Sequence, residues 1–419
     1  MGPESRQIHV FGHGGQAMST PSLVLKSRDF LIFILLSYAL VVSLFIDGSQ
    51  RNYLVLFAAI LGGFLFLVFG LALQRQAFWA FVLFAVMAMR ANFLGGVGEL
   101  GSVALTFVYA LGYFAVAGLL DRVQDKRTFV QDMMRWIIYA FAILSILQMV
   151  ASIVGLPIPN LILSKGLFSY NSFAMEPSHL GRIVGVTMLC YVMLLRLPTS
   201  SNDSADLPKI RKKVVTAFLI TMLLSGSSLA AVAIAAVFVL SRSLVWVIAL
   251  VAISILIWPV FLLIDYEPIQ RVTLLLANLG SLDVASVLEA DHSGGIRVAP
   301  LLIYLSDASA AEPGFWFGYG SDGLRFFFLD RIPGLGDTVG AGFIPGFPVV
   351  YGTVITAFFV WVFIVLRTNA TSAPLVGFFI VFMSFSAWNA QVFWYGLILI
   401  QITYTASRDN AARLGSRAS

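Results

Sequence analysis

Long apolar runs alternate with short polar connections along most of this chain, and the pattern predicts helices that cross a membrane. Most of the runs have the length that a helix needs to traverse a bilayer. They lack the strict alternation of polar and apolar positions that marks an outer-membrane barrel. The expected spans outside one ambiguous segment are Phe30–Ile46, Tyr53–Leu73, Phe78–Met89, Ser102–Leu120, Trp136–Val154, Leu180–Leu195, Leu244–Ile264, Phe343–Leu366, Ala373–Ala387 and Val392–Thr405.

The ambiguous segment is Val214–Leu240, which is long for a single span and is interrupted by Ser225-Gly226-Ser227-Ser228. It could form one tilted helix or two short ones. Two helices place most of the 26 Lys and Arg residues on one side of the membrane, as the positive-inside rule requires of the cytoplasmic side. The sequence therefore predicts an all-α, polytopic membrane protein with about twelve transmembrane helices and both chain ends in the cytoplasm.

The stretch Asp265–Gly342 is the longest polar interruption, and the same count of spans places it on the outer face. Apolar residues recur at helical spacing in Pro268–Leu279, Ile296–Leu305 and Gly323–Ile332, which predicts short helices at the membrane surface. The expected organisation is a flexible tail over 1–28, a membrane bundle over 29–264, a large outer loop over 265–342, the last three spans over 343–405 and a cytoplasmic tail over 406–419.

Composition supports this class and excludes others. With 59% hydrophobic and only 11% charged residues, the chain is far from the composition of an ordinary soluble domain. Cys190 is the only cysteine, so neither an intrachain disulfide nor a cysteine metal cluster can form. The net charge of +5 is spread over many connections and does not indicate a nucleic-acid partner. No metalloprotease or P-loop motif is present, and we expect neither a metal nor another cofactor.

Charged residues gather at the outer ends of the expected spans and are absent from their middles. The absence of charged residues from the middles of the expected spans argues against an ion-coupled transporter, because such transporters usually keep some charged residues there. Arginine binds phosphate in a bidentate way, so a lipid-linked phosphate or pyrophosphate is the expected partner of the outer arginines. The alternative that single arginines snorkel or pair with loop carboxylates stays open. The charged residues at the outer mouths are Arg90, Glu176, His179, Arg182, Arg297, Arg325, Arg331 and Asp337.

A second cluster lies just before the span that starts at Leu180. Pro177 suits the first position of a helix, which leaves Glu176 beside a helix N-terminus. His179 and Arg182 are three residues apart and share one helix face. Glu176 is thus a candidate general base. Alternatively, Glu176 only caps the helix, whose dipole would stabilise the carboxylate and weaken it as a base.

Four features in this order resemble the O-antigen polymerase and O-antigen ligase superfamily, bacterial membrane glycosyltransferases of the GT-C type. They are the Glu-Pro-Ser segment at Glu176 before a helix, the serine-rich break at Ser225, the pair Ser293-x-x-x-Arg297 followed by Gly318-x-Gly320, and the long outer loop before the last spans. Together they cover most of the chain after residue 165.

The resemblance implies glycosyl transfer at the periplasmic face of the bacterial inner membrane, without a metal. The donor would be a growing glycan on undecaprenyl pyrophosphate, and the acceptor would be a hydroxyl of another lipid-linked repeat unit. A protein that regulates chain length is a further partner that the resemblance leaves open. Arg297 matches the arginine of the Ser-x-x-x-Arg motif and should contact pyrophosphate. The expected catalytic residues are Glu176, Arg297 and Asp337, and the expected substrate-binding residues are Arg90, His179, Arg182, Ser293 and Arg325.

The chain departs from the family pattern at two places. Many members carry an arginine directly after the serine of the helix break, whereas Gly226 follows Ser225 here, so a second phosphate ligand must come from Arg182, Arg90 or Arg325. Ligases tend to have a histidine shortly before the span that starts at Phe343, and this chain has none. We therefore expect a polymerase, with Asp337 or His179 as the alternative base, and keep a ligase and a lipid-linked oligosaccharide flippase or exporter as alternatives.

Overall fold

A computed structural model of the chain describes residues 21–40, 52–68, 75–94, 97–160, 169–198, 207–241, 274, 277, 284–290, 292–332 and 342–418. These residues form helices and connecting loops, with no β-strand among them. In the described part, five helices are long and apolar enough to cross a membrane: Arg75–Phe93, Gly98–Asp121, Lys126–Val154, Pro177–Leu195 and Gly342–Arg367. The expected all-helical class is confirmed.

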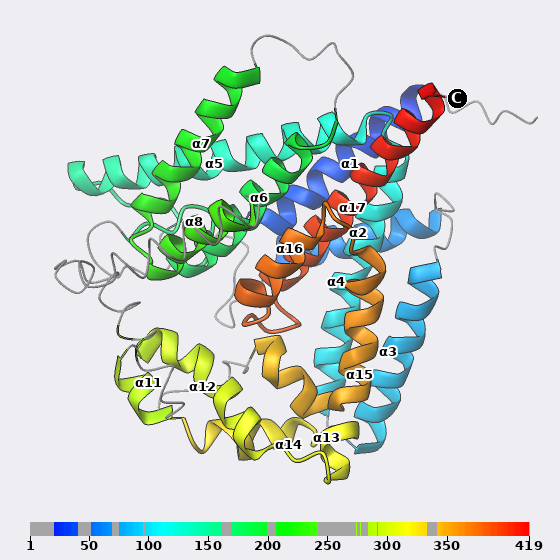
Figure 1. Cartoon of the computed structure of the whole chain (residues 1–419), viewed down its shortest axis with the longest axis vertical. Helices are drawn as coiled ribbons and strands as arrows, with labels where there is room; N and C mark the ends of the chain where they lie inside the picture. Colours follow the sequence, from blue (N-terminus) through cyan, green and yellow to red (C-terminus); the bar gives the residue numbers. More distant parts are fainter. Residues whose placement is uncertain are drawn as a thin grey trace, which may run out of the picture.

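Figure 1 shows the helices in chain order. The first part of the bundle contains α1 Pro21–Ala39, α2 Tyr53–Val68, α3 Arg75–Leu94, α4 Val97–Asp121, α5 Lys126–Val154, α6 Pro177–Leu195, α7 Leu207–Leu224 and α8 Ser228–Leu240. The predicted outer loop contains α11 Val284–Ala290, α12 His292–Asp307, α13 Pro313–Phe317, α14 Ser321–Leu324 and the π-helical turn η2 Arg325–Leu329. The last part contains η3 Gly342–Gly346, α15 Phe347–Phe363, η4 Val365–Arg367, α16 Ala373–Phe378, η5 Phe379–Met383 and α17 Gln391–Ala418.

The predicted total of about twelve spans is wrong for the part of the chain that the structure describes. A helix forms at each expected span that lies there, but the apolar helices over Tyr53–Leu65, Leu229–Leu240 and Ala373–Met383 are too short to count as candidate spans. Helix α17 is long, but polar residues such as Gln401 and Thr403 lower its hydropathy. The expected span Leu244–Ile264 lies outside the described residues.

The ambiguous segment forms two helices, as predicted. Helix α7 ends at Leu224 and α8 begins at Ser228, with Gly226 between them at φ 55°, a left-handed conformation that favours glycine. Other boundaries follow ordinary capping signals. Asp125 caps α5 by accepting a hydrogen bond from the Thr128 N–H at 3.2 Å, and Gly155 ends the same helix at φ 75°.

Helix α17 is the centre of the bundle, packed against α1, α4, α5 and α6. Its residues Trp394 and Tyr395 are completely buried. Helix α5 instead exposes large apolar side chains along one side, including Trp136, Ile143 and Leu147. A buried core together with exposed apolar helix faces is the arrangement that a bundle in lipid requires.

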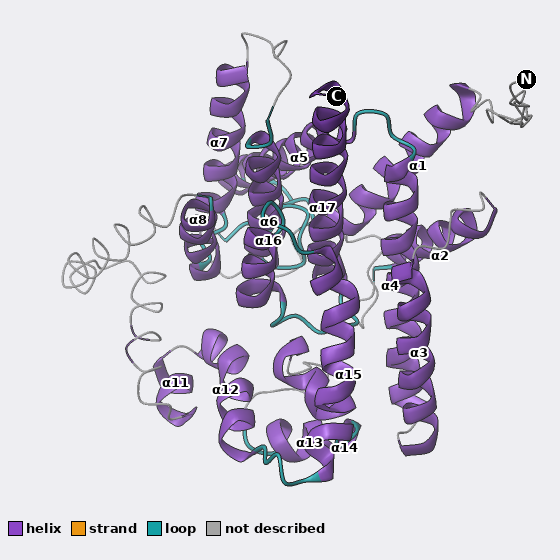
Figure 2. Cartoon of the chain, turned by 45° about the vertical axis from the view of Figure 1, so that its right-hand side comes forward, coloured by secondary structure: helices purple, strands orange, loops and turns teal. Residues whose placement is uncertain are grey.

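The loop helices have a hydrophobic cluster of their own. Ala299 and Ile303 of α12 pack with Phe327 and Phe328 of η2 and with Val349 of α15. The prediction of short helices over Ile296–Leu305 and Gly323–Ile332 is confirmed, while most of Pro268–Leu279 lies outside the described residues. Figure 2 shows α11 to α14 gathered at the end of the molecule away from the C-terminus. This arrangement brings α12 near the N-terminal end of α6.

Candidate functional site

The N-terminus of α6 carries the first half of the site. Pro177 occupies its first turn, and Glu176 precedes it with extended backbone angles, φ −145° and ψ 161°. The Glu176 carboxylate makes no capping hydrogen bond to the helix backbone. It accepts a hydrogen bond from the Ser178 hydroxyl instead. The carboxylate therefore contacts neighbouring side chains. It does not cap the helix, which was the alternative that the sequence left open.

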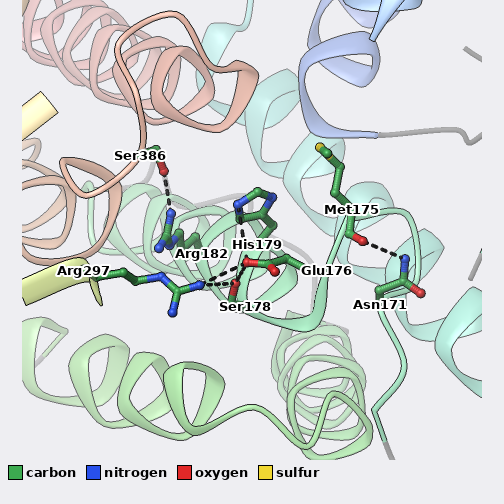
Figure 3. A network of polar contacts seen from close by, with 8 residues as sticks. All are labelled: Asn171, Met175, Glu176, Ser178, His179, Arg182, Arg297 and Ser386. Atoms are coloured by element: carbon green, nitrogen blue, oxygen red, sulfur yellow. Dashed lines mark hydrogen bonds and ion pairs between the residues drawn. The ribbon is translucent and has the colours of Figure 1, made fainter. Parts of the chain in front are cut away.

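Helix α12 supplies the second half of the site through Arg297 (Figure 3). Its Nη2 donates to Glu176 Oε1 at 3.2 Å and to the Ser178 Oγ at 3.3 Å. His179 Nε2 lies 3.7 Å from the same Glu176 oxygen. The Arg297 and Glu176 side chains are 27% and 19% exposed, so the ion pair is open to a ligand. Two residues 121 positions apart thus meet at one accessible point.

Arg182 lies one helical turn beyond Ser178 and is almost completely buried, at 3% exposure. Its Nη1 donates to the Ser386 Oγ at 2.6 Å, while its Nε has no hydrogen-bond partner among the described residues. The guanidinium interacts electrostatically with both Arg297 and Glu176. Two guanidinium groups therefore lie near a single carboxylate, which leaves an excess of positive charge that suits an anion.

The other two predicted arginines lie elsewhere. Arg90 forms an ion pair with Glu99 in the first turn of α4, and its Nε donates to the Phe317 carbonyl at 3.2 Å. Arg325 lies in η2, with its Nε 3.5 Å from Asp330 and its side chain 77% exposed. Of the three candidates for a second phosphate ligand, the structure places Arg182 beside Arg297.

Gly318-Tyr319-Gly320 holds the loop against α15. Helix α15 is broken at Gly352, φ 84°, and the Val349 and Val350 carbonyls accept the N–H groups of Tyr319 and Gly320 at 2.7 and 3.2 Å. Gly318 has φ 88°, and a Cβ there would lie 2.2 Å from the Val350 oxygen. Only glycine fits so close an approach, so this part of the resemblance corresponds to packing of the loop.

Two predicted site residues cannot be placed by their side chains. Asp337 lies outside the described residues, and Ser293 is in α12, where only its backbone is described. Ser225 at the helix break is buried, and its hydroxyl donates to the Met222 carbonyl at 2.6 Å. In the described ranges, no group of three or more His, Cys, Asp and Glu side chains is arranged to hold a metal ion.

Sequence reasoning missed three partners in these clusters. Ser178 was visible in the Glu-Pro-Ser segment, where its position two residues after Glu176 was a usable signal. Glu99 lies just before the predicted span Ser102–Leu120, but nothing in the sequence linked it to Arg90. Ser386 contacts Arg182 from a position 204 residues away, and a small hydroxyl in a short loop gives no sequence signal.

Comparison with known proteins assigns no family to the chain. No protein-family model and no curated protein matches the sequence.

Proposed function

We propose that this protein is a membrane-embedded glycosyltransferase, a polysaccharide polymerase that transfers a growing glycan from undecaprenyl pyrophosphate to a lipid-linked repeat unit. The observation that supports the proposal is the cluster of Arg297, Arg182 and His179 around the carboxylate of Glu176. It combines groups that bind pyrophosphate with a group that accepts a proton, which are the two requirements of this transfer.

In the proposed reaction, a hydroxyl oxygen of the acceptor attacks the anomeric carbon of the donor sugar. The bond between that carbon and the pyrophosphate oxygen breaks, and the pyrophosphate leaves on its lipid carrier. Arg297 and Arg182 stabilise the negative charge that develops on the leaving group. The hydroxyl proton passes to the carboxylate of Glu176.

The ion pair between Arg297 and Glu176 is the state of the proposed site before the donor binds. Its side chains are partly exposed, and such pairs contribute little to stability, about 1 kcal/mol or less. A pyrophosphate carries more charge than a carboxylate and offers bidentate oxygens to the guanidinium. Binding of the donor would therefore replace Glu176 as the partner of Arg297 and release the carboxylate to act as the base.

Arg182 would act as the fixed part of the phosphate site. It is buried, and Ser386 holds one end of its guanidinium. Its Nε is buried without a partner among the described residues, so the guanidinium keeps one unused donor. A buried cation with an unused donor next to an accessible arginine is what a preorganised anion site needs.

We also propose that the protein lies in the bacterial inner membrane, with the Glu176 cluster facing the periplasm. Its support is the bias of basic residues in the sequence, which assigns the cluster to the side with fewer of them. Lipid-linked repeat units presented there would be the substrates, with a chain-length regulator as a further partner.

The test is the size of the polysaccharide made in cells that depend on this gene. Arg297→Ala should lower the amount of long-chain product by at least about a hundredfold, since loss of one oxyanion-binding donor costs that much elsewhere. Arg331→Ala is the matched control, because Arg331 contacts Asp307 at the other end of α12. Undiminished chain length in correctly inserted Arg297→Ala protein would refute the proposal.

The same gel distinguishes the ligase that the sequence left open. Loss of a polymerase leaves single repeat units on the lipid carrier, whereas loss of a ligase leaves complete polymer on it. Accumulation of polymer on the carrier in the Arg297→Ala strain would assign the site to a ligase.

A further inference from the structure

A cavity bounded by described residues lies apart from the Glu176 cluster. It has a volume of about 570 Å³ and is lined by residues of α3, α4, α5, η4 and α17. A volume of this size is in the range of sites for small ligands. None of the residues assigned to the proposed reaction lines it.

Helix α6 shows that this cavity lies at the opposite end of the bundle. The Glu176 cluster is at its N-terminus, while its last turn meets the start of α5, where Arg127 donates to the Leu194 carbonyl at 3.1 Å. The neighbouring Lys126 lines the cavity and contacts Asp409 of α17 at 3.1 Å. The 19 residues of α6 separate the two places by roughly 28 Å, at 1.5 Å per residue.

Basic side chains outnumber acidic ones around the cavity. Arg75, Lys126, Arg367 and Arg408 line it together with Asp121 and Asp409. Asp409 is already neutralised, because it contacts both Lys126 and, at 2.9 Å, Arg413. Arg75 and Arg408 are exposed and have no ion-pair partner within the described ranges. The cavity therefore has positive charge available for an anion.

The buried side chains of Gln76, Tyr113 and Gln401 form a hydrogen-bonded network that holds Arg367 in place. Arg367 Nε donates to Gln76 Oε1 at 2.7 Å, and Gln76 Nε2 donates to the Tyr113 hydroxyl at 2.7 Å. The Tyr113 hydroxyl donates to Gln401 Oε1 at 3.0 Å. The Arg367 guanidinium also lies 5.3 Å from the centre of the Tyr404 ring. A guanidinium fixed on several sides loses little entropy when it binds a ligand.

We propose that this cavity binds a phosphate-bearing anion at the end of the bundle opposite the Glu176 cluster. Arg75, Arg367 and Arg408 form the binding face, and Arg367 is its preorganised member. The phosphate belongs either to the headgroup of an anionic phospholipid or to a soluble ligand. Basic pockets between membrane helices suit lipid headgroups, and the arginine fork suits any phosphate.

The experiment measures thermal unfolding of the purified full-length protein in a neutral detergent. Every protein used carries Arg297→Ala, which removes the accessible arginine of the Glu176 cluster, so that failure of the proposed function leaves this test intact. One arm adds phosphatidylglycerol, with phosphatidylcholine as its zwitterionic control. The other arm adds inorganic pyrophosphate at constant ionic strength.

We expect at least one of the two anions to raise the unfolding temperature. Arg75→Gln with Arg408→Gln should weaken that effect at least about tenfold in midpoint concentration, because two charge-assisted contacts are lost. Arg211→Gln is the matched control, since Arg211 is exposed in the first turns of α7 and does not line the cavity. A shift with phosphatidylglycerol alone identifies the lipid headgroup, and a shift with pyrophosphate identifies a soluble phosphate. No shift with either anion, or a shift that the double variant retains, would overturn the proposal.

Discussion

Two arginine–glutamate pairs in this protein have the same chemistry and different surroundings. Arg297 and Glu176 join α12 to the start of α6, and their side chains are 27% and 19% exposed. Arg90 and Glu99 join the facing ends of α3 and α4, and their side chains are 8% and 1% exposed. The two pairs have the same residue types, so their burial decides whether a ligand can reach them.

The surroundings of the buried pair fit a structural role. Arg90 also donates to the Phe317 carbonyl, and its guanidinium lies beside Gly320 of the loop that packs against α15. The pair thereby ties the loop helices to the bundle. Removal of one partner would leave the other charge buried and uncompensated, which is costly. The open pair has no such constraint, since water can solvate either group.

The largest expected effect is on stability at the buried pair. Glu99→Ala should lower the free energy of unfolding by about 3–5 kcal/mol, because Arg90 would keep its buried charge without a counterion. Thermal or denaturant unfolding of the detergent-solubilised protein measures the change. Glu289→Ala, at an exposed position of α11, is the control and should change stability by less than about 0.5 kcal/mol. Equal stability of the two variants would show that the buried pair is not structural.

The next effect is on activity at the open pair. Glu176→Gln keeps the shape and hydrogen-bonding capacity of the side chain but removes its basicity. Turnover of lipid-linked repeat units should fall at least about a hundredfold, the lower range for loss of a general base. The free energy of unfolding should change by less than about 1 kcal/mol, because the pair is exposed. Near-normal turnover across pH would exclude Glu176 as the base.

The smallest effect concerns a third ion pair, on the surface of the loop helices. Hydrogen bonds from Ser306 and then from Arg331 hold the pKa of Asp307 below its ordinary value. A lowered pKa in the folded state adds stability that is complete above the ordinary value and is lost as pH falls through the lowered one. The unfolding free energies of wild type and Asp307→Asn should differ by less than about 1 kcal/mol at pH 7, and the difference should shrink as pH falls through the lowered pKa. A difference that does not shrink on acidification would contradict this assignment.

The sequence predicted most of the helices and half of the candidate site. Apolar runs located the helices, and Pro177 located the start of α6, because both signals are local in the chain. Glu176, His179 and Arg182 were also grouped correctly, since they lie within two helical turns. Among the described residues, fewer helices than expected are long and apolar enough to cross a membrane, because the length of an apolar run does not give the length of the helix that forms in it.

Long-range pairing was the part that sequence could not supply. Arg297 was singled out by its motif, but its contact with Glu176 depends on where α12 packs. Arg90 was assigned to the substrate because its outer position resembles that of Arg297, and only the fold shows its contact with Glu99. The predicted membrane topology tells at which end of the bundle a residue lies. It does not tell which residues of other helices are its neighbours.

The most direct test of the central claim is binding of undecaprenyl pyrophosphate to the purified protein. Arg297→Ala should weaken binding at least about tenfold, the loss expected for one charge-assisted contact to pyrophosphate. Arg331→Ala should leave the affinity unchanged, because that arginine pairs with Asp307 away from the Glu176 cluster. Equal affinity of wild type and Arg297→Ala would contradict the account and reduce the open pair to a contact between two helices.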